Sequence, residues 1–142
     1  MNKAFYDYDQ YSIPKRFEGE IIRHDKDDLL VVVYASDYDM HSELLSKILL
    51  AIKFDLQENV CLIKLKEDEQ FNLSRLSMEY ISEVICIGIK PNVISMNASF
   101  AANVFYQTES FSIMLTHSLE RLSQDNKRKK ALWNALQIKF LK

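Results

Sequence analysis

The stretch Leu29-Leu30-Val31-Val32-Val33-Tyr34-Ala35 indicates the fold class of this 142-residue chain. It is a continuous apolar run rich in β-branched residues, and polar residues do not interrupt it. Such runs are typical of strands buried on both faces, as in a parallel sheet that helices cover. The run therefore predicts a central strand of an α/β domain.

A turn and a helix are predicted directly after this strand. The turn Ser36-Asp37-Tyr38-Asp39 offers an aspartate as a candidate N-cap residue. Leucine and isoleucine side chains then recur at spacings of three and four, which predicts one apolar face of a helix over about 39–54.

The rest of the chain continues this alternation of strands and helices. Further strands are predicted at 60–65, 84–89 and 111–115, with helices at 73–80 and 127–141 and a short turn of helix that Ser118 caps and that runs through Leu122. A short strand is also predicted within 19–23. Alternation of this kind predicts a three-layer α/β/α sandwich around a mostly parallel, four-stranded sheet.

The first 28 residues differ from the rest because they lack a helical or strand period. We interpret 1–28 as a partly extended N-terminal arm and 29–142 as a single α/β domain. The arm carries five aromatic residues: Phe5, Tyr6, Tyr8, Tyr11 and Phe17. Exposed aromatic side chains would suit docking on a partner protein, and the alternative is that they fold back onto the domain's own surface.

Composition limits the classes of function. Apolar residues make up 48% and charged residues 27% of the chain, as in an ordinary globular domain. The formal net charge of −2 gives no global signature of nucleic-acid binding. The N-terminus has no signal-peptide core and the apolar runs are too short to span a bilayer, so we expect a cytoplasmic protein without membrane contact.

The sequence offers little for catalysis or for holding a cofactor. Cys61 and Cys86 lie in apolar strands and suit a protein core, and the three histidines are far apart. With two glycines, the chain has no glycine-rich phosphate loop, and we expect neither cofactor nor metal. Asp37 and His117 follow predicted strands and could form an acid–base pair, the alternative being a helix cap and a turn residue.

The basic run Lys127, Arg128, Lys129 and Lys130 is a second candidate site. It begins a predicted helix, where positive charge opposes the helix dipole. One interpretation is a contact with nucleic acid or with an acidic partner. The other is a solvated helix start with mobile side chains.

Several of these segments together resemble the psi subunit of bacterial DNA polymerase III. Gln10-Tyr11-Ser12-Ile13 and the Phe-Glu-Gly-Glu-Ile of 17–21 are similar to the Gln-Trp-x-Leu and x-Gly-Glu-Ile segments of that family. The strand, turn and leucine-rich helix over 29–52 resemble the opening of its core. Residues 115–122 (Leu-Thr-His-Ser-Leu-Glu-Arg-Leu) and the Ala-Leu-Trp at 131–133 resemble its C-terminal part.

The resemblance implies a non-catalytic accessory subunit of the clamp loader. By that resemblance, Gln10, Tyr11 and Ile13 in the arm would bind the loader's motor subunits. Tyr11 stands where the family usually carries tryptophan, so the anchor keeps an aromatic ring with less area. The folded domain would bind a chi-like subunit, which contacts single-stranded DNA-binding protein.

The psi fold in turn is similar to that of uracil-DNA glycosylases, so the resemblance implies a glycosylase-like fold. Those enzymes carry Gly-Gln-Asp-Pro-Tyr after the first strand and His-Pro-Ser-Pro after the last. At the matching positions only Asp37 and Ser118 agree, and His117 is offset by one. We therefore expect no glycosylase activity; the alternatives are a nucleobase-glycosylase-like enzyme, or an unrelated interaction module on the same fold.

Overall fold

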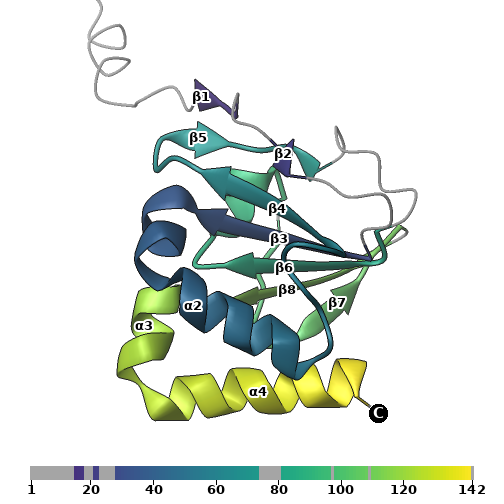
Figure 1. Cartoon of the computed structure of the whole chain (residues 1–142). Coiled ribbons are helices and arrows are strands. Elements are labelled where there is room, and N and C mark those ends of the chain that lie inside the picture. The colour runs from purple at the N-terminus through teal and green to yellow at the C-terminus, as the bar shows by residue number, and fades with distance from the viewer. Residues whose placement is uncertain are drawn as a thin grey trace, which may run out of the picture.

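A mostly parallel sheet forms the centre of the domain. The computed structural model describes residues 15–17, 21–22, 28–73, 81–96, 98–108 and 110–141. Within them the sheet has the strand order β2-β4-β3-β6-β8-β7 (Figure 1). Its strands are β2 (Ile21–Ile22), β3 (Leu29–Tyr34), β4 (Val60–Leu65), β6 (Glu83–Ile87), β7 (Phe105–Gln107) and β8 (Ser112–Thr116).

The four predicted strands are the parallel centre of this sheet. β4, β3, β6 and β8 pair in parallel, while β2 and β7 add antiparallel edges. The α/β class and the mostly parallel sheet are therefore confirmed, and the predicted count of four left out the edge strands β2 and β7. β2 lies within the short strand predicted at 19–23, whereas the three residues of β7 carry too little pattern to be recognised in a sequence.

β3 is central because both of its faces are apolar. Leu29, Val31 and Val33 point into one core cluster, and Leu30 and Val32 point into the other. All five side chains are fully buried. This is the burial expected of an uninterrupted β-branched run between two neighbouring strands.

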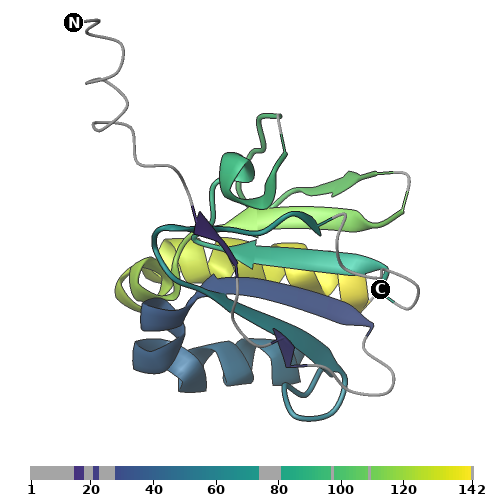
Figure 2. The ribbon, with the colours of Figure 1, turned by 90° about the horizontal axis from the view of Figure 1, so that it is seen from above.

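Three helices cover one face of the sheet: α2 (Ala35–Ala51), α3 (Leu119–Gln124) and α4 (Asn126–Phe140). Figure 2 shows α2 and α4 running beneath the strands. Leu45 and Leu49 of α2 and Leu132 and Leu136 of α4 are buried in the core cluster on this face. The predicted start of α2 is wrong: the helix begins at Ala35 and kinks at His41, where φ is −133° and ψ is 29°.

The opposite face is covered differently in the part of the chain that the structure describes. A two-stranded parallel sheet of β1 (Lys15–Arg16) and β5 (Glu69–Gln70) and the short 3₁₀ helix η2 (Pro91–Ile94) lie over it. The helix predicted at 73–80 falls on residues 74–80, outside the described residues. Cys61 and Cys86 are free, buried thiols in this core, as predicted, and burial raises the pKa of Cys86.

The end of the arm packs against the domain. Phe17 donates its main-chain N–H to the carbonyl of Gln70 at 2.9 Å, and its ring packs edge-on against Phe71 at 5.5 Å. For Phe17, the alternative that the aromatic rings fold back onto the domain is confirmed. The described part of the arm is thus held against the domain at β1 and Phe17.

Gly88 controls how closely β6 approaches the start of α3. It follows β6 with φ of +69°, a conformation that glycine adopts without strain. Its N–H donates to the carbonyl of Thr116 at 2.9 Å. A Cβ atom at this position would lie 2.9 Å from both Cα and Cβ of Ser118. The glycine therefore allows Ser118 to lie against the end of β6.

We expect Gly88→Ala to lower the free energy of unfolding by about 2 kcal/mol or more, because it combines a strained backbone with a clash. Urea unfolding followed by circular dichroism measures the loss. Gly88→Asn serves as the comparison, since asparagine tolerates positive φ but keeps the clash. It should also destabilise, although less than alanine. Wild-type stability in the alanine variant would contradict this role for Gly88.

Candidate functional site

Asp37 connects the first helix of the domain to the start of α3. Its Oδ2 accepts a hydrogen bond from the N–H of Leu119 at 2.7 Å, and its Oδ1 accepts one from the N–H of Glu120 at 3.1 Å. Ser118 caps the same helix, as predicted, because its Oγ accepts from the N–H of Arg121 at 3.2 Å. Three main-chain donors at the start of α3 are therefore satisfied by side chains.

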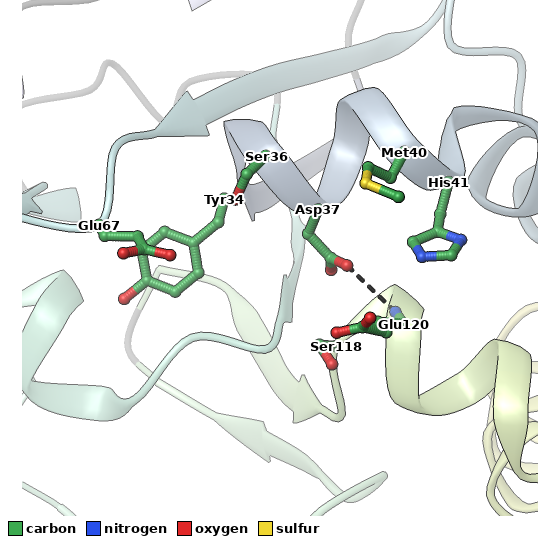
Figure 3. Close-up of a pocket in the computed structure, with 8 residues that line it drawn as sticks. All are labelled: Tyr34, Ser36, Asp37, Met40, His41, Glu67, Ser118 and Glu120. Carbon is green, nitrogen blue, oxygen red and sulfur yellow. Dashed lines mark hydrogen bonds between the residues drawn. The ribbon is translucent and has the colours of Figure 1, made fainter.

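The prediction that an aspartate caps its own helix is wrong. β3 passes directly into α2, and the N-cap residue Tyr34 makes no side-chain capping bond. Asp37 consequently lies inside the first turn of α2, where its carboxylate reaches across to α3 (Figure 3). The sequence shows a capping residue at this position but does not show which helix it caps.

A pocket of about 450 Å³ opens beside this contact. Its lining residues come from the end of β3, the first turns of α2, the loop after β4 and the start of α3: Tyr34, Ser36, Asp37, Met40, His41, Glu67, Ser118 and Glu120 (Figure 3). β3 pairs with β4 on one side and with β6 on the other, so the pocket lies where strand order reverses. Parallel α/β sheets generally bind their ligands at this place.

The pocket is acidic. Three carboxylates, of Asp37, Glu67 and Glu120, line it, and neither lysine nor arginine is among its lining residues. Burial raises the pKa of Tyr34, and the negative charge of Glu67 raises it further. The pocket is thus suited to a cation or to a hydrogen-bond donor, and it would repel a phosphate group.

His117 does not complete an acid–base pair with Asp37. It is absent from the lining of the pocket, and both Asp37 oxygens accept bonds from the backbone of α3. Its charged neighbours are Arg128, Arg121 and Asp125. Partial burial lowers the pKa of His117, and Arg128 and Arg121 lower it further. The two candidates that were close to strand ends in the sequence are therefore not brought together.

The basic run occupies the first turn of α4. Lys127 and Lys130 are exposed, while Arg128 and Lys129 are half-buried. Asp125 caps the helix by accepting from the N–H groups of Lys127 at 3.0 Å and Arg128 at 3.3 Å. It also forms an ion pair with Arg128, in which Nη1 lies 3.4 Å from Oδ2.

The arm candidates Gln10, Tyr11 and Ile13 lie outside the described residues, so their role stays a prediction. Sequence reasoning missed Tyr34, Glu67 and Glu120 as pocket residues. Each lies at the end of a strand or the start of a helix on the carboxyl side of the sheet, which is the signal that could have indicated them.

Neither a metal centre nor a membrane span is found in the described part of the chain. No group of three or more histidine, cysteine, aspartate or glutamate side chains there could hold a metal ion. No described helix has the length and apolarity needed to cross a bilayer. A scan against protein-family models finds no match, and no curated protein matches the chain. The resemblance to the psi subunit therefore stays a prediction.

Asp37→Ala should lower the free energy of unfolding by about 1 kcal/mol, the usual cost of losing a helix cap. Amide hydrogen exchange at Leu119 and Glu120 should accelerate, because their N–H groups lose their acceptor. Asp39→Ala is the matched control, since Asp39 is exposed on the same helix. Equal stabilities and equal exchange rates in the two variants would contradict the capping role of Asp37.

Arg128→Gln should raise the pKa of His117, because it removes a cation that opposes protonation while Asp125 stays in place. NMR titration of the histidine ring protons measures this, and Lys47→Gln on exposed α2 surface should leave the pKa unchanged. The folded state binds this proton less readily than the unfolded state does. The free energy of unfolding therefore carries no penalty from His117 above the ordinary pKa of 6.5, and it decreases as the pH falls below that value. An unchanged pKa in Arg128→Gln would show that Arg128 does not contribute to the lowering, which would then come from burial and Arg121.

Proposed function

We propose that this chain is a non-catalytic, psi-like accessory subunit of the bacterial DNA polymerase III clamp loader, working in the cytoplasm as a protein-binding bridge. Its arm, through Gln10, Tyr11 and Ile13, binds the motor subunits of the loader. Its folded domain binds a chi-like subunit that is linked to single-stranded DNA-binding protein. The proposal rests on the sequence resemblance together with the chemistry of the pocket.

The observation that carries the proposal is that Asp37 has a structural role, in which it holds the start of α3. A glycosylase needs an acid or base placed against a flipped nucleotide in a pocket that accepts DNA. Here the carboxylate of Asp37 holds the start of α3 with both oxygens. The pocket beside it adds Glu67 and Glu120, which would repel the DNA backbone. Both features favour a binding role over the alternative of a nucleobase-glycosylase-like enzyme.

The anchoring of the arm also supports a bridging role. β1 pairs with β5, and Phe17 is fixed on Phe71, so residues 1–14 are joined to the domain through an ordered strand. A partner bound by residues 1–14 and a partner bound by the folded domain would use separate parts of one chain.

Tyr11→Ala should weaken binding to purified clamp-loader motor subunits by about 30-fold, equivalent to about 2 kcal/mol, as expected for a buried aromatic anchor. Isothermal titration calorimetry with the full chain measures this. Tyr6→Ala is the matched control, since it removes the same ring elsewhere in the arm. A chain that lacks residues 1–14 keeps β1 and Phe17 and should fold but not bind.

Three results would contradict the proposal. Equal affinity of the Tyr11→Ala and wild-type chains would remove the arm from the binding mechanism. Excision of uracil from DNA by the wild-type chain, lost in Asp37→Asn, would instead support the glycosylase alternative. Binding to neither loader nor chi-like subunit would favour an unrelated interaction module.

A further inference from the structure

A cluster of positive side chains lies where α3 and α4 meet. It consists of Arg121 of α3 and Lys127, Arg128, Lys129 and Lys130 of α4, and we refer to it as the basic corner. It lies at the end of the molecule where the parallel strands have their carboxyl ends (Figure 1). A chain with a net charge of −2 thus concentrates five positive charges on two consecutive helices.

The three lysines of the basic corner contribute little to the fold. Positive side chains at the start of a helix oppose its dipole. Arg128 is paired with Asp125, and Arg121 lies in the last turn of α3, where positive charge is favourable. Within the described part of the chain, no ion pair is found for Lys127, Lys129 or Lys130. These three charges are therefore left to attract an external anion.

The surroundings of the basic corner indicate which anion it suits. Its exposed neighbours are mostly polar and lack large apolar side chains: Glu120, Ser123, Gln124, Asn126, Ala131 and Asn134. The large exposed apolar side chains of the described residues lie elsewhere, at Met40, Leu50, Val104, Ile138 and Leu141. Protein interfaces need a desolvated apolar centre, whereas contacts to a phosphate backbone are polar and strongly charged. The corner therefore suits a nucleic acid better than an acidic peptide.

The helices of the basic corner expose no aromatic ring among the described residues, and this favours a duplex over a single strand as the ligand. Proteins that bind single strands stack bases on aromatic side chains. The nearest aromatic residue on α4, Trp133, is half-buried and packs against the core cluster. The basic corner thus offers charge without a stacking surface, which matches the regular phosphate array of a duplex.

We propose that the basic corner binds the phosphate backbone of a nucleic-acid duplex without reading its sequence. The proposal goes beyond binding to the clamp loader and does not depend on it. The acidic pocket lies on the other side of α3, where Glu120 adjoins Arg121. The negative charge of the pocket repels the phosphates of the duplex. The duplex therefore reaches the basic corner from the side away from the pocket.

Fluorescence anisotropy with a short DNA duplex and the full chain tests the proposal. The combined variant Lys127→Gln, Lys129→Gln and Lys130→Gln should bind at least about tenfold more weakly at about 50 mM salt. The slope of log K against log salt should become shallower by about 0.9 for each lysine that contacts a phosphate. The matched control carries Lys47→Gln, Lys66→Gln and Lys90→Gln, three exposed lysines with the same total charge, and should bind like wild type.

A second readout reports the place of binding. Bound phosphate would screen Arg121 and Arg128 and so raise the pKa of His117, which NMR follows with and without the duplex. An RNA duplex measured in parallel tells which nucleic acid supplies the phosphates. The proposal is overturned if the duplex does not bind, if the triple variant binds as the control does, or if a single strand or polyglutamate binds more tightly than either duplex.

Discussion

The carboxylate of Asp37 holds together two parts of the chain that are 82 and 83 residues apart, since it accepts from the N–H groups of Leu119 and Glu120. β3 and α2 form the first strand–helix unit of the domain, and α3 begins the last helical segment. This junction determines where α4 lies on the sheet. It also brings together the residues of α2 and α3 that line the acidic pocket. Gly88 makes it sterically feasible, because Ser118 lies against the end of β6.

Much of the sheet could be predicted from the sequence because its centre is uniformly apolar. The predicted strands at 29–35 and 60–65 agree with β3 and β4 to within one residue, and Ser118 caps a short helix as expected. Local patterns of this kind report burial and capping directly. β2 falls within the short strand predicted at 19–23, but β7 could not be found in that way, since three residues show no period.

The candidate site was less predictable because it depends on contacts between distant segments. A rule for strand ends placed Asp37 and His117 in one region, but nothing in a linear sequence fixes which way each side chain points. Asp37 turns toward the backbone of α3, whereas His117 lies close enough to Arg121, Arg128 and Asp125 for their charges to shift its pKa. Glu67 and Glu120 join the pocket because β4 ends beside β3 and α3 begins beside α2.

The short helix α3 separates charges of opposite sign. On one side lie the carboxylates of the pocket, and on the other lie the arginine and lysine side chains that open α4. The small net charge of −2 conceals this local separation. A charged partner that comes within a Debye length, about 8 Å at physiological salt, would be attracted on one side of α3 and repelled on the other. The helix thus favours one direction of approach for any highly charged assembly.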